Sequence, residues 1–126
     1  MMNQCFKDIP GVVWDMVDLS DSPLTIVMDE GRFVAPNVLN ADGSLGVRMV
    51  KKGAINQILQ KLGKPIVSTS PNKSGEPSPL EFQLIDKAIS NQVDFTFPFS
   101  SDLEMSGKPS KIIRIAQNGE VKILRK

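Results

Sequence analysis

The chain has 126 residues, of which 40% are hydrophobic and 23% charged, a size and balance typical of one globular domain with a formal net charge of only +1. It contains no histidine and its composition includes no tyrosine, which excludes Ser-His-Asp triads, Cys-His pairs and histidine-ligated zinc sites. What remains is chemistry by positioning and charge, in which hydroxyl, amide, Lys and Arg groups organise an already activated substrate such as a nucleotide.

The first half of the chain predicts one helix and two strands. Over residues 9–19, apolar side chains recur at helical spacing, which predicts an amphipathic helix. The runs LTIVM at 24–28 and LGVRM at 45–49 are short and mostly apolar, which favours strands. The stretch 35–44 between them holds Pro, Asn, Asp and Gly and is expected to form a loop.

The second half predicts alternating helices and strands. Residues 51–63 place apolar side chains on one face and stop at Gly63, so they predict the clearest helix. A strand is expected at 65–69, a loop at 70–79 and a second helix at 80–90. A weak strand near 94–97 and a polar loop follow, and the Asn118-Gly119 pair then predicts a hairpin between strands at 112–116 and 121–124.

This order of elements predicts an α/β fold with a twisted mixed sheet, parallel and antiparallel, and flanking helices in a single domain over residues 1–126. A chain that begins on a helix, with no strand before it, is unusual for such a fold. We therefore expect that the N-terminal portion of the domain is missing.

Cysteine content and charge indicate the surroundings of the chain. Cys5 is the only cysteine, so no internal disulfide can form and a cytoplasmic location is expected. No secretory leader is evident, and no segment approaches the roughly 18 apolar residues of a membrane span, so no membrane partner is expected. Residues 1–44 carry a net charge of −5 and residues 45–126 a net +6. The second half could attract phosphorylated molecules or nucleic acid, although many solvated surfaces show the same asymmetry.

Hydroxyl and amide groups are dense at residues 68–75, STSPNKSG, between the predicted strand at 65–69 and the helix at 80–90. Loops beyond the carboxyl ends of strands converge at the crevice of α/β sheets, where such donors suit phosphate or carboxylate oxygens. The same residue types form ordinary turns, and composition alone favours the plain turn.

Two strand residues are ambiguous from spacing alone. Arg48 is the single charged residue in LGVRM, and burying it without an anionic partner would be costly, which makes it a candidate clamp for an anion. A strand arginine that faces solvent fits the spacing equally well. Thr25 is an ordinary strand former unless neighbouring residues bring a ligand near its hydroxyl.

Four linked segments resemble motifs of the YrdC/TsaC family. Residues 22–26, SPLTI, resemble the family's Pro-Gly-Pro-Leu-Thr strand entry, and residues 45–48, LGVR, resemble its Gly-Val-Arg strand. Residues 65–75, PIVSTSPNKSG, are similar to its Ser-Thr-Ser-Ala-Asn-x-Ser-Gly signature. Residues 108–110, KPS, and 121–125, VKILR, resemble its closing Pro-Ser-Thr and arginine-containing hairpin.

The resemblance, which runs from about residue 9 to the C-terminus, implies a concave, positively charged sheet face and an L-threonylcarbamoyladenylate synthase. Such an enzyme condenses L-threonine, bicarbonate and ATP into threonylcarbamoyl-AMP, releases pyrophosphate and serves the modification of adenosine beside the tRNA anticodon. ATP is thus expected as a substrate, accompanied by Mg²⁺, with no tightly bound cofactor. Binding of tRNA or double-stranded RNA is also implied.

Carried onto matching positions, the resemblance implies that nucleotide and acyl-adenylate contacts come from hydroxyl, amide and guanidinium groups, namely those of Thr25, Arg48, Ser68, Ser70, Asn72, Ser110 and Arg125. Their roles would be hydrogen bonding and charge neutralisation at phosphate and carbamoyl oxygens. No catalytic residue and no metal ligand is assigned.

Departures from the family pattern weaken the expectation of catalysis. Family members begin with a strand, a Pro-Thr-(Asp/Glu)-Thr loop that holds threonine and a Lys-x-Arg segment that binds phosphates, none of which occurs in this sequence. Pro71 and Lys111 replace a family Ala and Thr. The alternative functions are a non-catalytic module that binds RNA or nucleotide, and self-association through an exposed sheet edge.

Overall fold

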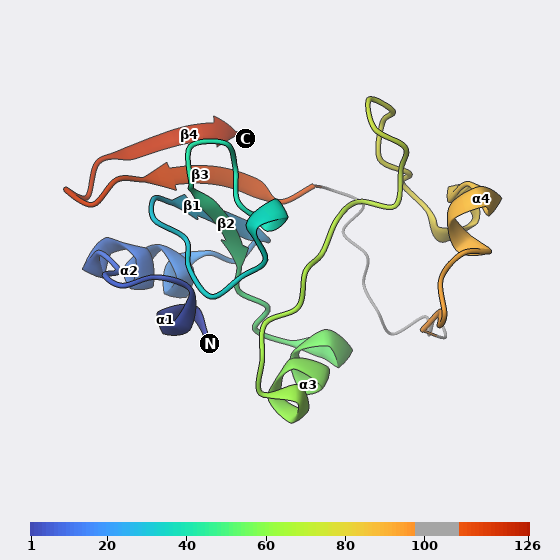
Figure 1. The fold of residues 1–126 in the computed structure, drawn as a ribbon, viewed down its shortest axis with the longest axis horizontal. Helices are drawn as coiled ribbons and strands as arrows, with labels where there is room; N and C mark the ends of the chain where they lie inside the picture. Colours follow the sequence, from blue (N-terminus) through green and yellow to red (C-terminus); the bar gives the residue numbers. More distant parts are fainter. Residues whose placement is uncertain (98–108) are drawn as a thin grey trace. The chain divides into compact units, whose positions relative to one another are not determined.

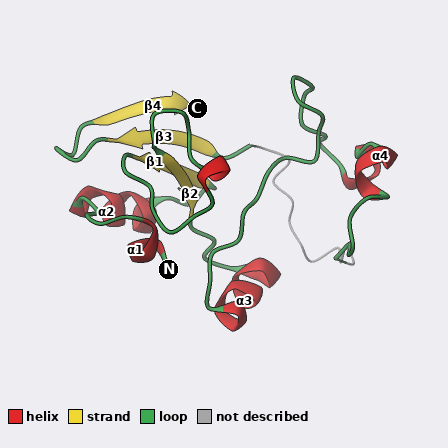
Figure 2. Ribbon diagram, viewed as in Figure 1, coloured by secondary structure: helices red, strands yellow, loops and turns green. Residues whose placement is uncertain are grey.

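The computed structural model describes residues 1–97 and 109–126. The chain divides into two compact units, one formed by Met1–Ile66 with Pro109–Lys126 and the other by Val67–Lys108. Figures 1 and 2 show that all the strands belong to the first unit and that the described part of the second is mostly loop. The single domain over residues 1–126 stays a prediction.

A four-stranded sheet in the order β2-β1-β3-β4 forms the first unit. Its strands are β1 (Leu24–Met28), β2 (Leu45–Arg48), β3 (Lys111–Ile115) and β4 (Val121–Arg125). β1 pairs in parallel with β3, whereas the pairs β1 with β2 and β3 with β4 are antiparallel. The sheet is therefore mixed, and the predicted α/β class and closing hairpin are confirmed.

The helices of the described residues are short. They are α1 (Met2–Cys5), α2 (Gly11–Leu19), α3 (Gly53–Leu62) and α4 (Lys87–Ser90), with 3₁₀ turns η1 (Pro36–Val38) and η2 (Phe82–Leu84). α2 and α3 confirm the two helices predicted in the first half and at 51–63, while α1 was not predicted. No helix in the described ranges is long and apolar enough to span a membrane.

The hydrophobic core lies between one face of the sheet and the helices α1 and α2. Residues two apart on a strand share a face, so Ile26 and Met28 of β1 lie beside Ile113 and Ile115 of β3. These side chains are buried together with residues of α1, α2 and β2, namely Met2, Cys5, Phe6, Val13, Val17 and Leu45. Figure 1 shows α1 and α2 on the same side of the sheet. The opposite sheet face carries Thr25, Val27 and Arg114, of which Val27 is also buried.

Three predicted elements of the second half are wrong. Residues 65–69 form no strand, because no neighbouring strand pairs with their backbone among the described residues. All five residues are exposed. Only η2 and the four-residue α4 form within 80–90, since the apolar residues Leu80, Phe82 and Leu84 stay exposed and a helix there would bury no face. Residues 94–97 form no strand, and the polar loop predicted after them lies mostly outside the described residues.

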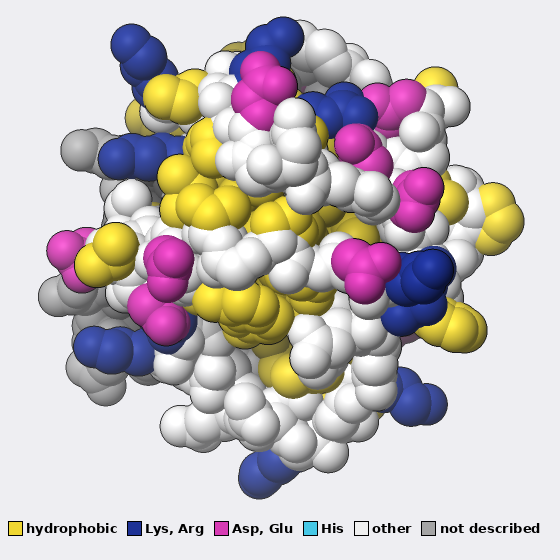
Figure 3. Space-filling view, turned by 90° about the vertical axis from the view of Figure 1, so that its left-hand side faces the viewer, with side chains coloured by type: hydrophobic (Ala, Val, Ile, Leu, Met, Phe, Trp, Pro, Cys, Tyr) yellow, Lys and Arg dark blue, Asp and Glu magenta, His cyan; other side chains and the backbone are white. Residues whose placement is uncertain are grey.

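Some large apolar side chains remain at the surface. In the first unit, Trp14 of α2 is 37% exposed and Ile123 of β4 is 61% exposed. On the face of the molecule drawn in Figure 3, apolar side chains gather in the middle and charged side chains surround them. Such patches accompany association sites, so the predicted self-association stays open.

Burial differs sharply between two isoleucines that pair across β3 and β4. Ile113 is 7% exposed, and its partner in the register, Ile123, is 61% exposed. We expect Ile113→Ala to lower the free energy of unfolding by about 2–5 kcal/mol, because it leaves a cavity in the core. The matched variant Ile123→Ala should cost less than about 1 kcal/mol. Urea unfolding followed by circular dichroism measures both, and equal losses would contradict the assignment of the core.

Candidate functional site

One register row crosses all four strands at one end of the sheet. Arg48 of β2 pairs with Thr25 of β1, Thr25 with Ile112 of β3, and Ile112 with Arg125 of β4. The pairing shifts by one residue between Ile112 and Ile113, so that Leu124 is left without a partner. Such a bulge redirects a side chain. Three predicted site residues therefore lie in a single row.

The side chains of Thr25, Ser110 and Arg125 form one connected cluster, here called the hydroxyl-arginine cluster. Thr25 Oγ1 and Ser110 Oγ lie 2.8 Å apart. Arg125 donates from Nε and Nη2 to the carbonyl oxygen of Ser110, at 3.0 and 2.7 Å, and from Nη2 to Ser110 Oγ at 3.3 Å. Ser110 is only 8% exposed, so the cluster has a buried hydroxyl at its centre. The guanidinium of Arg125 is consequently held through two of its nitrogens by one residue.

The cluster lies at one end of the sheet. Thr25 and Ser110 lie at the amino ends of the parallel strands β1 and β3. Arg48 and Arg125 end the antiparallel strands β2 and β4. β2 runs antiparallel to β1, and β4 runs antiparallel to β3. The arginines at the carboxyl ends of β2 and β4 therefore lie at the same end of the sheet as the hydroxyls at the amino ends of β1 and β3.

Arg48 is exposed, and its side chain forms no hydrogen bond or ion pair with any residue in 1–97 or 109–126. The solvent-facing arrangement is the one observed, and the role of Arg48 as a clamp for an anion stays a prediction. An exposed guanidinium keeps its planar set of donors for an anion.

The remaining predicted site residues, Ser68, Ser70 and Asn72, belong to the second unit. Ser68 and Ser70 are exposed. Asn72 is half-buried, and its Nδ2 donates to the carbonyl oxygens of Lys73 and Glu76 at 3.0 and 2.9 Å. Its amide thus holds its own loop together. The structure groups Thr25, Ser110 and Arg125 and sets Arg48 in their row, whereas Ser68, Ser70 and Asn72 stay predicted ligand groups.

An ion pair closes the loop that follows Asn72. Lys73 Nζ lies 2.5 Å from Asp86 Oδ2, just before α4, and Asp86 also accepts a hydrogen bond from the backbone of Ala88. The hydrogen bond from Lys73 lowers the pKa of Asp86. Lys73, although it stands within the signature-like segment, is consequently already paired.

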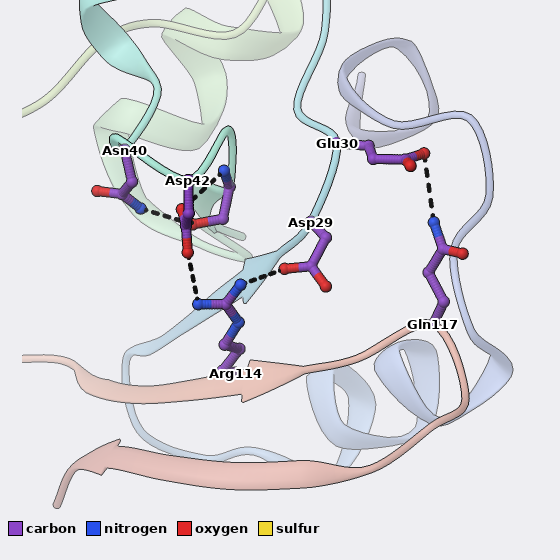
Figure 4. A network of polar contacts seen from close by, with 7 residues as sticks. Asp29, Glu30, Asn40, Asp42, Arg114 and Gln117 are labelled. Carbon is purple, nitrogen blue, oxygen red and sulfur yellow. Dashed lines mark hydrogen bonds and ion pairs between the residues drawn. The ribbon is translucent and has the colours of Figure 1, made fainter.

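A polar network around Arg114 was not predicted from the sequence (Figure 4). Arg114 of β3 donates from Nη1 to Asp42 Oδ2 at 2.8 Å and pairs through Nη2 with Asp29, which follows β1. Asp42 accepts hydrogen bonds from the Ser44 hydroxyl at 2.6 Å and from the Ser44 backbone at 3.1 Å. The network ties the loop before β2 to β3. The only sign of this network in the sequence was an arginine within the apolar run 112–116. Its acidic partners lie far away in the chain, so no local pattern pointed to them.

Because Arg114 is ion-paired with Asp29 and Asp42, it is not an unpaired cation that faces solvent. The pKa of Asp42 lies well below its ordinary value, first because the Ser44 side chain donates to it and then because Arg114 does. Two carboxylates therefore balance the one guanidinium. Arg48 and Arg125 have no ion pair with any described residue of this sheet face, and of the two only Arg125 is held by hydrogen bonds.

The Arg114 network predicts a pH-dependent stability. Because the folded pKa of Asp42 is depressed, its contribution is present above the ordinary carboxyl pKa and is lost as the pH falls through the folded value. We expect Asp42→Asn to be less stable than the parent at neutral pH, and the difference to shrink below about pH 4. Urea unfolding across this range measures it. Asp15→Asn, on the exposed side of α2, is the control, and the same pH dependence in both variants would contradict the network.

Comparison with known proteins adds to this geometry. The sheet topology and the hydroxyl-arginine cluster define a mixed-sheet α/β protein with polar groups gathered at one end of the sheet. The Sua5/YciO/YrdC family model, described as "Telomere recombination", matches residues 1–126, and the chain belongs to this family. The predicted membership is therefore confirmed. No solved structure matches the chain.

Proposed function

We propose that this chain binds ATP and an acyl-adenylate on the sheet face that carries the hydroxyl-arginine cluster, as an L-threonylcarbamoyladenylate synthase does. The reaction joins L-threonine, bicarbonate and ATP into threonylcarbamoyl-AMP and releases pyrophosphate. One observation supports the proposal above the others. Thr25 and Arg125 each contact Ser110, beside an Arg48 side chain that has no partner among the described residues, and all four occupy positions that match family motifs.

Each of these groups has a distinct part in the proposal. Arg48, exposed at one edge of the sheet, binds the phosphates of the nucleotide. Arg125, held at Nε and Nη2 by Ser110, keeps Nη1 for an anionic oxygen. The Thr25 hydroxyl completes the cluster between them. Fixed donors of this kind stabilise the charge that develops as the bond to pyrophosphate breaks, because they need no reorganisation during the reaction.

Magnesium enters this proposal only with the nucleotide. Among residues 1–97 and 109–126, no three or more acidic or cysteine side chains gather as a metal site. Mg²⁺ would be held by the phosphate oxygens of ATP, as ions of this size commonly are. Arg48 and Arg125 act on the phosphates directly, and neither role requires a metal ligand from the chain.

Binding of ATP is the first test, measured by isothermal titration calorimetry at low ionic strength. We expect Arg48→Gln to weaken the affinity by about tenfold or more, since a charge-assisted hydrogen bond is lost. Lys61→Gln removes the same charge from the last turn of α3 and serves as the control. An affinity that falls equally in both variants, or in neither, would reject the proposed phosphate site.

A measurement of turnover distinguishes an enzyme from the alternative, a non-catalytic binding module. The basic balance of residues 45–126 favours anion binding with or without chemistry. Pyrophosphate release from ATP, threonine and bicarbonate is the reaction to measure. Release that requires all three substrates together is the result expected of the enzyme. Salt-dependent binding of tRNA or double-stranded RNA without pyrophosphate release would favour the binding module.

A further inference from the structure

Gly46, in the middle of β2, is a glycine that the fold does not require. Its φ angle lies outside the left-handed region, unlike that of Gly63, which ends α3 with a φ of +67°. A Cβ built at Gly46 would meet its nearest neighbours, Thr25 Cγ2 and Val27 Cγ2, at 3.5 and 3.7 Å, which are ordinary contacts. By contrast, a Cβ at Gly31 would come within 2.6 Å of Leu45 Cβ. Neither backbone conformation nor packing therefore explains the glycine at 46.

A glycine inside a strand has a cost in stability, because it is entropically unfavourable and contributes no side chain to cross-strand pairs. Where the fold does not demand it, such a glycine marks a close approach of a ligand or of another backbone. β2 is an edge strand, and Gly46 is exposed, so within the described residues no backbone occupies that space. A bound ligand would account for this glycine.

The neighbours of Gly46 give the chemistry of this ligand. The two methyl contacts place the empty Cβ position on the same sheet face as Thr25 and Val27. Arg48 lies two residues along β2 and thus on this same face, about 7 Å away. On the other side stands the turn at Ser44, which Asp42 holds. The surface at Gly46 therefore has no side chain of its own, lies beside two methyl groups of β1, and is bordered by a cation at one end.

We propose that Gly46 is a specificity-determining position, over which the base and sugar of the nucleotide lie while Arg48 binds the phosphates. This inference rests on the proposed ATP site and adds the part of the ligand that each strand residue contacts. Unpaired backbone groups on the outer edge of β2 supply donors and acceptors for the rim of the base. A side chain at position 46 would occupy the space of the ring and leave the phosphate contacts intact.

Two probes and one substitution test the inference. ATP carries a base and a sugar, and inorganic tripolyphosphate carries neither. In Gly46→Val we expect the affinity for ATP to fall by about tenfold or more, since the added branches block the strip. The affinity for tripolyphosphate should stay within about twofold of the parent, and the thermal unfolding midpoint should be equal or higher, because valine favours strands. Gly46→Ala, which adds a single Cβ at ordinary contact distances, gives a smaller loss of ATP affinity in a minimally altered strand.

The outcomes distinguish this inference from the proposed function. If Gly46→Val and Gly46→Ala bind ATP as well as the parent does, the inference is wrong while the ATP site stands. A parallel loss of ATP and tripolyphosphate, with the unfolding midpoint retained, also overturns it, because position 46 would then border the phosphates. If the parent chain binds neither probe, the proposed function fails and the inference fails with it.

Discussion

The parallel pairing of β1 with β3 is the constraint on which the rest of the structure depends. It joins Leu24–Met28 to Lys111–Ile115, two segments from opposite ends of the chain, and it aligns Ile26 with Ile113 in the core. The same pairing brings Thr25 within hydrogen-bonding distance of Ser110. Core and candidate site therefore share one register, with Ile26 and Ile113 on one face of the strands and Thr25 on the other. A slip by one residue would exchange these faces and disrupt both.

Much of the first unit could be predicted from the sequence, because its signals are local. The run LTIVM gave β1 with its observed bounds, Gly63 gave the end of α3, and the Asn118-Gly119 pair gave the closing hairpin. The loop at 70–79 is confirmed, but the strands at 65–69 and 94–97 and the helix at 80–90 were wrong, because apolar spacing does not reveal whether a face will be buried. Residues 65–69 have strand-like composition but no strand beside them among the described residues.

The candidate site was predictable only in part, for a similar physical reason. Motif positions identified Thr25, Ser110 and Arg125, but their mutual contacts depend on pairing between distant strands. Arg114 shows the limit most plainly. Its partners Asp29 and Asp42 lie more than seventy residues earlier in the sequence, so no local pattern could tell that this arginine is neutralised while Arg48 is not. The order of strands in the sheet must be known before Arg114 can be distinguished from Arg48.

The bulge at Leu124 has a consequence for how the length of this strand can vary. With regular pairing, Leu124 would lie opposite Ile112, and Arg125 would point toward the face covered by helices. Because the bulge adds one residue, Arg125 instead pairs with Ile112 and contacts Ser110. Loss of Leu124 would keep the arginine in that place, whereas an insertion after it would turn the guanidinium away. Among natural relatives, gaps in this strand should therefore concentrate at one position, and its arginine should tolerate a shorter strand better than a longer one.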